Sequence, residues 1–425
     1  MKCGNAHLGY GAAARIKSVG EIAGAGQRAR RKGDTVFELT EEDQAIARVT
    51  RSFIEREVMP FEPILIQREA EGGSGELTRE EELAIQKKGQ ASGLWGIDLP
   101  EEDGGADLSM TAQCIVHFEM GRTFIRFEFG GVARPSLHLL EGDLRKRYLD
   151  PVVAGEKVCS FALSEPGVGS DAGNNLRTTA VLDGDSWILN GEKTWISRGN
   201  DADFAIVFAR TPMPNDPHGV TAFLVDRDMG FTSKRIEMMC NEHGTSSLFF
   251  DDVRVPKDNH IGEVGQAFSS VAAMSLRRRR IWGIALNAGA MDRLLEMAIE
   301  WSENRVTFGK PLSERENIQW MIADGETATR ATKLLCLHAA SLYDRGLDHR
   351  HATDAAKVFG ANAAMRVADD VMQIHGAMGI AKETGIERYY RKLRMYRFAD
   401  GSDEMQRRTI ARDLFKRNTK VGEIL

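Results

Sequence analysis

The sequence is poor in the residues that build disulfide scaffolds, zinc sites and membrane spans. It has five cysteines in 425 residues, far apart along the chain, with no C-x-x-C pair and no clustered histidines. This spacing argues against a zinc site and a disulfide framework, and it favours reduced thiols in a cytosol-like compartment. No apolar run approaches the roughly 18 residues that a spanning helix needs. The sequence therefore predicts a soluble protein without a metal site.

The chain also lacks a marked excess of charge of either sign. Lys and Arg total 56 against 62 for Asp and Glu, which gives a formal net charge of −6. This balance argues against nucleic acid or an anionic membrane surface as the main partner. The length is sufficient for roughly two or three domains, or for one large multilayer unit.

The first 36 residues contain few acidic side chains, since Glu21 is the only one before Asp34. Arg-rich leaders of this kind occur in organelle transit peptides. A disordered tail or an over-long start explains the composition more simply, and we favour these two alternatives. We expect no catalytic chemistry from this segment.

Hydrophobic periodicity divides the rest of the chain into blocks of different character. From Thr40 onward, an acidic T-E-E-D helix start and helically spaced apolar residues predict helices to about residue 155. A stretch rich in Gly and Pro, GLWGIDLPEEDGGADL at 93–108, predicts a surface loop between them. Short β-type runs separated by turn residues, such as SWILNGEKTWI, DFAIVFAR, VTAFLVD and SLFFDDVRV, then predict a compact all-β segment.

Helical periodicity returns after Gly265 and continues to Leu425. Three long helices that would pack as a bundle are expected at about 266–304, 315–345 and 350–376. The order of helices, strands and helices predicts a leader or disordered tail at 1–36, an N-terminal helical domain at 37–155, a β domain at 156–265 and a C-terminal helical domain at 266–425.

Two segments of the β block carry candidate binding features. In CSFALSEPGVGSDAG, at 159–173, the glycines let backbone N–H groups approach a ligand, and Ser164 and Ser170 add hydroxyl groups. In NGEKTWISRGNDADF, at 190–204, Trp195 and a small hydroxyl residue end a strand. A Gly/Pro turn would explain the glycines alone, and Trp195 could be a core residue.

Two segments of the C-terminal block carry similar features. The segment ENRVTFGKPLSERENIQ, at 303–319, joins two helices and places Arg305 before a Gly-Lys-Pro turn. The segment QIHGAMG, at 373–379, ends a helix with glycines that admit another backbone or a phosphate chain. Alternatively, Arg305 is an ordinary solvated charge and the second segment an ordinary helix end.

The segment RFADGSDEMQRR, at 397–408, places a carboxylate beside a glycine just before a predicted helix. Asp and Ser side chains accept hydrogen bonds from the first N–H groups of a helix, and acidic residues suit the positive end of its dipole. The local pattern by itself therefore favours a helix cap at Asp400 over a catalytic base.

Each motif is weak by itself, yet all of them occur in one order at consistent spacing, together with FFDDVRVP at 249–256. In this combination the chain resembles the acyl-CoA dehydrogenase family from about Thr40 to Lys416. The resemblance implies an α+β, mostly α, fold with an N-terminal helical domain, a middle β-barrel-like domain and a C-terminal four-helix bundle. It also implies a homo-oligomer, typically a tetramer that is a dimer of dimers.

The resemblance further implies FAD as cofactor, an acyl-CoA substrate and an electron-transferring flavoprotein as partner. It implies a cytoplasmic location, or the mitochondrial matrix if the source is eukaryotic. Flavin contacts are expected from the β domain, with Ser170 also facing the thioester: Phe161, Leu163, Ser164, Gly169, Ser170, Trp195 and Ser197. Contacts to the pyrophosphate and adenosine end are expected from a neighbouring subunit: Arg305, Thr307, Phe308, Gln373 and Gly376. Two further residues would close the site, Ser402 and Glu404.

By the same resemblance, Asp400 occupies the position of the base that removes the α-proton, where most members have Glu. Gly401 follows it and Arg280 matches an arginine near the base. Family position therefore outweighs the local preference for a cap. Because Asp is one methylene shorter than Glu, and displacements near 1 Å can cost about 100-fold in rate, the substitution argues against ordinary straight-chain substrates.

Some members place the base on the first long helix of the bundle, at the position that Arg279 occupies here, so this alternative is absent. The run SLRRRR, at 275–280, is unusual. Its arginines could contact CoA phosphates or pair with acids, and for Arg277 and Arg278 we favour surface pairing.

Other functions remain open on the same fold, because a fold does not fix its chemistry. One is a flavin-dependent monooxygenase, which needs no α-proton base, so a carboxylate at Asp400 argues against it. Another is a protein that binds CoA or flavin without turnover, in which Asp400 is only a cap. The acyl group of the substrate cannot be identified from the sequence.

Overall fold

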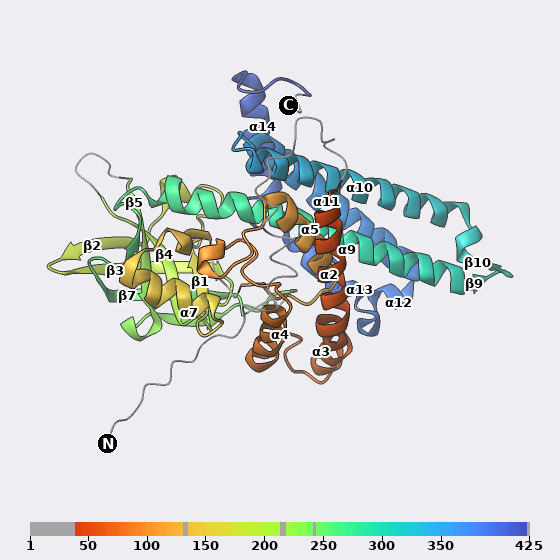
Figure 1. Cartoon of the computed structure of the whole chain (residues 1–425), viewed down its shortest axis with the longest axis horizontal. Helices are drawn as coiled ribbons and strands as arrows, with labels where there is room; N and C mark the ends of the chain where they lie inside the picture. The colour runs from red at the N-terminus through yellow and green to blue at the C-terminus, as the bar shows by residue number, and fades with distance from the viewer. Residues whose placement is uncertain (1–38, 131–134, 213–217, 241–243, 423–425) are drawn as a thin grey trace.

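The computed structural model describes residues 39–130, 135–212, 218–240 and 244–422. The expectations for residues 1–36 lie outside these described residues. A group of helices opens the fold, a β-sheet follows and a long helical region closes it, which confirms the predicted fold class. Figure 1 places the sheet at one end of the long axis and an arm of helices at the other.

Two helices of the N-terminal region begin with reciprocal caps that the sequence dictates. The hydroxyl of Thr40 accepts a hydrogen bond from the N–H of Asp43, whose carboxylate accepts one from the N–H of Thr40, each at 3.0 Å. Thr78 and Glu81 repeat this capping box. The predicted helix start at T-E-E-D is thus confirmed. The helices of the region are α2 (Glu41–Phe53), α3 (Glu62–Ala70), α4 (Arg79–Ala91), α5 (Met110–Gly121), α6 (Gly142–Leu144) and α7 (Asp150–Val153).

The segment at 93–108 differs from the surface loop that its Gly and Pro residues predict. It has little regular structure, but Leu94, Ile97 and Leu99 are each at most 5% exposed. Burial of such a side chain stabilises the fold by about 1.5–3 kcal/mol. The apolar residues therefore anchor this loop in the core, and the expectation of a surface loop is wrong for them.

The sheet follows the order β6-β7-β3-β2-β4-β5-β8, and β1 pairs in parallel with β4. The four runs quoted from the sequence form β3, β7, β4 and β5, of which the last two are almost entirely buried because their sequences are nearly continuously apolar. The strands are β1 (Cys159–Ala162), β2 (Thr179–Asp183), β3 (Ser186–Ile196), β4 (Phe204–Arg210), β5 (Val220–Asp226), β6 (Thr232–Arg235), β7 (Ser246–Pro256) and β8 (His260–Ile261), with the short helix α8 (Ala172–Asn175) after β1.

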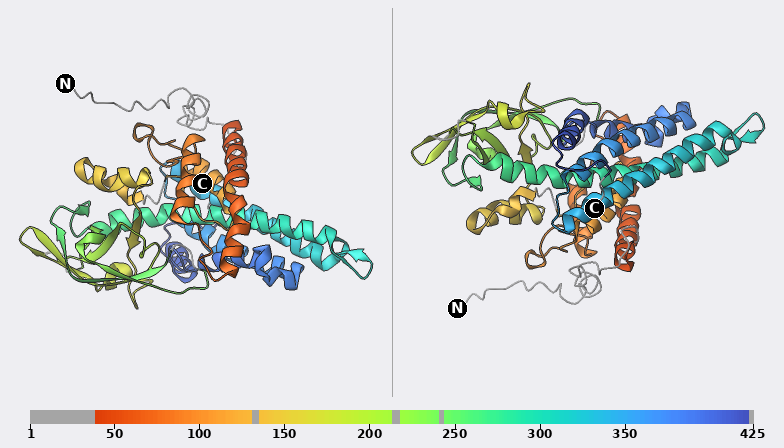
Figure 2. Two further views of the ribbon diagram at one scale, coloured as in Figure 1. Left: turned by 90° about the horizontal axis from the view of Figure 1, so that it is seen from below. Right: turned by 90° about the horizontal axis from the view of Figure 1, so that it is seen from above.

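The C-terminal region is built on three long helices, close to the predicted ranges. Figure 2 shows the first of them, α9, crossing the molecule from beside the sheet to the tip of the arm. A small hairpin of β9 (Val306–Thr307) and β10 (Lys310–Pro311) forms that tip. The helices are α9 (Ala273–Asn304), α10 (Glu316–Asp344), α11 (Arg350–His375), α12 (Ala377–Ile380), α13 (Ile386–Met395) and α14 (Asp403–Phe415).

Close backbone packing joins α5 to α9. A Cβ atom added at Gly121 would lie 2.1 Å from the carbonyl oxygen of Leu286, and one added at Gly289 would lie 1.9 Å from that of Phe118. Real Cβ atoms do not approach so closely, so these glycines permit the contact. The two helices thereby bring their side chains to one pocket, described below.

No described helix is long and apolar enough to cross a membrane. The described residues also contain no group of three or more His, Cys, Asp or Glu side chains arranged to hold a metal ion. Two of the cysteines that are distant in the sequence meet in space, since the sulfur atoms of Cys114 and Cys336 lie 3.7 Å apart as buried thiols.

Candidate active site

Asp400 lies in a sharp turn between α13 and α14. Its φ is 54° and that of Gly401 is 103°, both in the left-handed region. The N-cap of α14 is Ser402, whose hydroxyl accepts a hydrogen bond from the N–H of Met405 at 3.4 Å. The local preference for Asp400 as a helix cap is therefore wrong, because the capping group lies two residues further along the chain.

Two cations bind consecutive carbonyl oxygens of this turn. Arg280, on α9, donates from Nε to the carbonyl oxygen of Asp400 at 2.7 Å. Lys357, on α11, donates from Nζ to the carbonyl oxygen of Gly401 at 2.7 Å. A Cβ atom at Gly401 would lie 2.9 Å from Nη2 of Arg280, and its φ also requires glycine. The expected neighbours of Asp400, Gly401 and Arg280, do lie beside it.

A buried carboxylate fixes the start of α14. Asp403 is almost completely buried and accepts hydrogen bonds from the amide of Asn362 at 2.9 Å and from Nε of Arg397 at 3.0 Å. Lys357 lies 3.4 Å from the same carboxylate. Burial lowers the pKa of Lys357, while the charge of Asp403 opposes that shift. The turn that carries Asp400 is therefore held at both ends.

A second buried carboxylate lies behind Arg280. Oδ1 of Asp354, on α11, lies 3.4 Å from Nη1 of Arg280. Burial raises the pKa of Asp354 to about 6, against the opposing attraction of Arg280. This carboxyl group therefore changes its charge near pH 6, beside the arginine that binds the carbonyl oxygen of Asp400.

The side chain of Asp400 faces a small pocket of about 30 Å³. Side chains of α5, α9, α13 and the loop after α5 line it together with Asp400. The lining includes the apolar groups of Met120, Ile125 and Trp282, and five charged side chains: Arg126, Glu128, Arg279, Lys392 and Asp400. The pocket is therefore small, and charged side chains form much of its lining.

Arg279 forms the contact nearest to the candidate base. Its Nε lies 3.8 Å from Oδ1 of Asp400, and both side chains are 23% exposed. In the sequence, Arg279 was noted only because it occupies the position where some family members carry the base. No local signal in the sequence marked this contact, because adjacent helix residues such as Arg279 and Arg280 point in different directions.

The other arginines of the run have different partners. Arg278 lies 3.5 Å from the carboxylate of Asp98 and packs its guanidinium on the ring of Trp282, with only 14% of its side chain exposed. The expected pairing of Arg278 with an acid is therefore confirmed, but its surface location is wrong, because Asp98 lies in the loop that Leu94, Ile97 and Leu99 anchor in the core.

A neutral histidine lines the same pocket. His117, on α5, stacks on Trp282 with ring centroids 5.2 Å apart and shares a hydrogen bond of 2.7 Å between Nδ1 and the carbonyl oxygen of Gln113. Burial lowers its pKa. Because the ring is neutral and Nδ1 donates to a carbonyl, Nε2 is left as an acceptor.

The two candidate flavin segments meet at the end of the sheet. The N–H of Thr194 donates to the carbonyl oxygen of Ser164 at 2.9 Å, which brings the end of β1 beside the end of β3. Trp195 has a φ of 60° and is 61% exposed, so it is not the core residue considered as its alternative. The other members of the expected set lie on these two segments. Leu163 is buried, and the rest are half-buried or exposed: Phe161, Gly169, Ser170 and Ser197.

A buried ion pair holds these two strand ends together. Nζ of Lys193 lies 2.7 Å from Oε1 of Glu165, and both side chains are at most 2% exposed. The same carboxylate accepts hydrogen bonds from the N–H groups of Arg177 at 2.6 Å and Thr178 at 3.0 Å. Burial lowers the pKa of Lys193 to about 8. No motif marked this pair in the sequence.

The remaining expected cofactor residues lie far from the sheet in the same chain. Arg305, Thr307 and Phe308 are at the tip of the arm, where Phe308 is 98% exposed. Gln373 and Gly376 are exposed at the end of α11, where His375 stacks on Trp301 near the end of α9. Figure 1 shows the labels of β9 and β10 at the opposite end of the molecule from β1 to β7. One chain therefore does not bring the two sets together.

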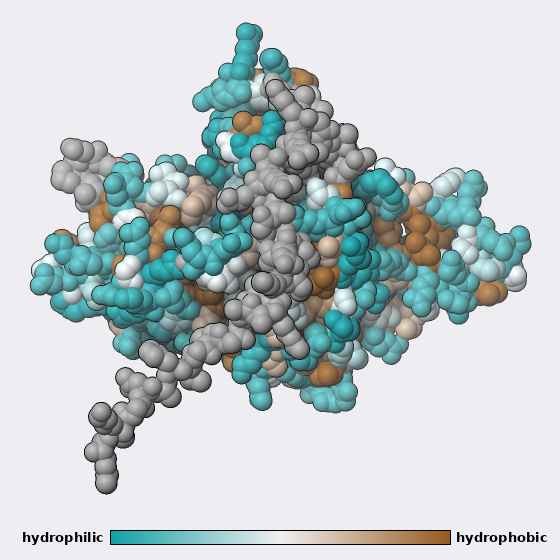
Figure 3. All heavy atoms as spheres, in the orientation of Figure 1, coloured by the Kyte–Doolittle hydropathy of each residue, from teal (hydrophilic) through white to brown (hydrophobic). Residues whose placement is uncertain are grey.

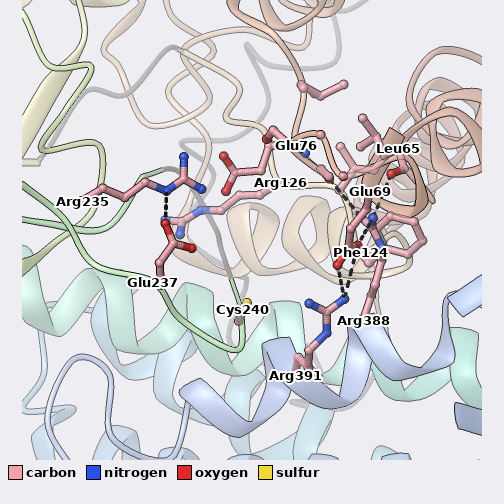
Figure 4. Close-up of a pocket in the computed structure, with 16 residues that line it drawn as sticks. Leu65, Glu69, Glu76, Phe124, Arg126, Arg235, Glu237, Cys240, Arg388 and Arg391 are labelled. Atoms are coloured by element: carbon pink, nitrogen blue, oxygen red, sulfur yellow. Dashed lines mark hydrogen bonds and ion pairs between the residues drawn. The ribbon is translucent and has the colours of Figure 1, made fainter. Parts of the chain in front are cut away.

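A larger cavity, of about 370 Å³, lies next to the Asp400 pocket and shares Ile125 and Arg126 with it. Figure 4 shows its charged side chains pointing toward one another. Arg388 and Arg391 pair with Glu69, and Arg235 lies 3.5 Å from Glu237. These charges are neutralised within the protein, so we place the chemistry at the smaller pocket with Asp400.

Comparison with known proteins identifies relatives over nearly the whole chain. Models of the N-terminal, middle and C-terminal domains of acyl-CoA dehydrogenase match residues 40–156, 160–253 and 269–415. The chain is 34% identical over 423 residues to the mitochondrial short-chain specific acyl-CoA dehydrogenase of Rattus norvegicus, covering 95% of this chain and 99% of the relative.

Two further relatives differ in their described roles. The chain is 33% identical to subunit CarC of the caffeyl-CoA reductase-Etf complex of Acetobacterium woodii, covering 89% of this chain and 99% of that subunit. It superposes on butyryl-CoA dehydrogenase from Megasphaera elsdenii with a TM-score of 0.77 at 28% identity, covering 89% of this chain and 99% of that one.

Proposed function

Because the chain belongs to the acyl-CoA dehydrogenase family, we propose that it catalyses the α,β-dehydrogenation of an acyl-CoA thioester and passes the electrons to an electron-transferring flavoprotein. The family consists of flavin-dependent oxidoreductases that use FAD. The single observation that carries the proposed chemistry is the carboxylate of Asp400 at the wall of a small pocket beside two cations, Arg279 and Arg280.

The exposed end of the sheet fits a flavin. An indole that is 61% exposed on a left-handed residue is unusual in a folded protein, and it offers a flat apolar surface for a planar ring. Ser164, Ser170 and Ser197 lie on the same two segments as this indole and offer hydroxyl groups for the flavin. When bound there, FAD supplies at flavin N5 the acceptor for the hydride that leaves the β-carbon.

Asp400 is proposed as the base that removes the α-proton. A thioester α-proton is a weak acid, so the developing negative charge on the thioester oxygen must meet preorganised donors. Among the residues that the structure describes, no acceptor is bonded to the backbone N–H of Asp400. This N–H is therefore available to the thioester oxygen, while the carboxylate of the same residue accepts the proton.

Shared sites between subunits are part of the proposal. The arm residues Arg305, Thr307 and Phe308 are proposed to hold the pyrophosphate region of the FAD of a neighbouring subunit, with Gln373 and Gly376 at its adenosine end. Ser402 and Glu404 are proposed to lie at the border of that site, in addition to the capping role of Ser402. The separation of the arm tip from the sheet within one chain supports an assembly of at least two subunits.

A screen of acyl-CoA thioesters tests the proposed function. The purified protein should be yellow, with about one FAD per subunit, and a substrate should bleach the flavin absorbance under anaerobic conditions. Addition of an electron-transferring flavoprotein should then restore the oxidised spectrum. A protein that no acyl-CoA bleaches, but that consumes oxygen with a reductant and a second substrate, would favour the monooxygenase alternative.

A further inference from the structure

The four consecutive arginines at the start of α9 are not equivalent. Arg278 and Arg280 each have structural partners, the first in Asp98 and Trp282, the second in the carbonyl oxygen of Asp400 and the carboxylate of Asp354. Arg279 has a single ion-pair contact, with Asp400 at 3.8 Å. Across the described part of the chain, neither terminal nitrogen of Arg279 has a hydrogen-bond acceptor.

The lack of hydrogen-bond acceptors for the terminal nitrogens of Arg279 is informative because of where its side chain lies. Its side chain is only 23% exposed and lines the pocket beside the candidate base. A guanidinium group presents five donors in a planar fork that matches the two oxygens of a carboxylate. A mostly buried guanidinium with open donors inside a reaction pocket therefore indicates an anionic group on the ligand.

The charge of the pocket agrees with this interpretation. Arg126, Arg279 and Lys392 contribute three positive charges, against the two carboxylates of Glu128 and Asp400. Glu128 lies 3.7 Å from Arg126 and Asp400 lies 3.8 Å from Arg279, while Lys392 donates to the carbonyl oxygen of Phe124. The lining therefore keeps one net positive charge, which an anionic group on the ligand would neutralise.

The phosphates of CoA are a second possible source of an anion, but they do not suit Arg279. The whole pantetheine arm separates the thioester from the phosphates. When the α-carbon lies at Asp400, a guanidinium only 3.8 Å from that carboxylate is beside the acyl group and not beside the phosphates.

We infer that the substrate is the CoA thioester of a short dicarboxylic acid, whose unesterified carboxylate binds Arg279. This inference rests on the proposed function and adds its substrate class. The substrate carboxylate competes with Asp400 for the guanidinium, so its arrival releases the base from its ion pair. Asp400 then removes the α-proton, and the β-hydride leaves to the flavin, so that the acyl group loses two hydrogens and two electrons.

The test compares thioesters of equal chain length that differ only in the terminal group. Succinyl-, glutaryl- and adipoyl-CoA are paired with butyryl-, pentanoyl- and hexanoyl-CoA on the FAD-loaded protein. The dissociation constant of each is measured by calorimetry, and flavin bleaching is followed anaerobically by stopped flow. At least one dicarboxylic thioester should bind about tenfold or more tightly than its partner, since a charge-assisted bidentate contact is worth that much.

Three variants separate the role of Arg279 from other effects. Arg279→Gln should lose the preference for the dicarboxylic thioester, and Arg279→Lys should retain only part of it, because Lys cannot bind a carboxylate with a planar fork. Arg277→Gln, in the same run but outside the pocket lining, should leave both binding and reduction rates unchanged.

Two results would overturn the inference while leaving the proposed function intact. One is wild-type bleaching that is as fast with pentanoyl-CoA as with glutaryl-CoA, at equal affinity. The other is an Arg279→Gln variant that slows both members of a pair by the same factor, which would assign the guanidinium to the thioester oxygen common to all substrates. If no thioester of either series bleached the flavin, the proposed function itself would fail.

Discussion

At the scale of single residues, Asp400 and Trp195 share an unusual backbone conformation, with φ of 54° and 60°. Such conformations cost of order 1–3 kcal/mol for residues other than Gly and persist only where the surroundings fix them. Arg280 and Lys357 fix the first through its own and the following carbonyl oxygen. The residue proposed to act as the base is thus held in place by two cations from other helices.

Asp354 leads to a prediction about pH. Burial raises its pKa from 3.8 to about 6, so the folded protein holds this proton more tightly than the unfolded chain does. The resulting contribution to stability is fully present below about pH 4 and is lost as the pH rises through 6. The loss amounts to about 3 kcal/mol, because one pKa unit corresponds to roughly 1.4 kcal/mol.

Thermal unfolding of the wild type and of Asp354→Asn between pH 4 and 7 measures this effect. The Asn variant does not titrate, so the other groups cancel in the difference between the two proteins. The wild-type midpoint should fall relative to that of the variant as the pH rises. Parallel curves would show that Asp354 does not titrate in this range.

At the scale of elements, the end of β1 and the end of β3 form one platform because Lys193 and Glu165 pair beneath it. Removing one partner of a buried pair leaves an uncompensated charge, which typically costs 3–5 kcal/mol. An exposed pair in the same sheet provides a contrast, since Arg254 and Asp183 lie 3.1 Å apart with about two thirds of each side chain exposed. Exposed pairs contribute about 0–1 kcal/mol.

Matched substitutions in these two pairs test the platform. Lys193→Met should lower the stability by about 3 kcal/mol and weaken FAD binding, because it leaves the carboxylate of Glu165 buried without its cation. Arg254→Met should change both quantities little. Unfolding midpoints and FAD dissociation constants measure the outcome, and equal effects of the two substitutions would contradict a special role for the buried pair.

Elements with a strong local signal could be predicted from the sequence, whereas contacts between distant segments could not. Helical spacing and the T-E-E-D cap located α2, and continuous apolar runs located β4 and β5. The contact of Lys357 with Gly401 joins residues 44 positions apart and has no local pattern. The pattern of Asp and Ser residues before α14 predicted a helix cap in this segment. It could not decide between Asp400 and Ser402, which is the residue that caps the helix.

At the scale of the whole molecule, the arm leaves apolar side chains exposed that a second subunit would cover in the proposed assembly. Figure 3 shows hydrophobic surface on the arm, and exposed apolar side chains of this region include Ile299, Phe308 and Trp320. An α-helix rises 1.5 Å per residue, so the 32 residues of α9 span about 48 Å between the sheet side and Arg305. The arm therefore serves the sheet of another subunit in the proposed assembly.

Subunit complementation tests this arrangement. Arg305→Glu should impair FAD binding by the arm, and Trp195→Ala should impair FAD binding by the sheet. Each variant alone should therefore bind FAD weakly. A hybrid of the two chains should regain about half of the FAD, since one of its two sites combines an intact sheet with an intact arm. If the hybrid bound no more FAD than the separate variants, each arm would serve its own chain.

The most direct test of the central claim, that Asp400 removes the α-proton, is the rate of anaerobic flavin reduction in Asp400→Asn. Asn keeps the size of the side chain and tolerates its left-handed backbone, but cannot accept the proton. Asp107→Asn is the matched control, because Asp107 also has a positive φ, of 43°, and lies outside the lining of the pocket. With a substrate found in the screen, Asp400→Asn should stay folded, bind FAD and bind the thioester, while stopped-flow reduction slows by about 100-fold or more and the control stays at the wild-type rate. Reduction of Asp400→Asn at a near-normal rate would contradict the assignment.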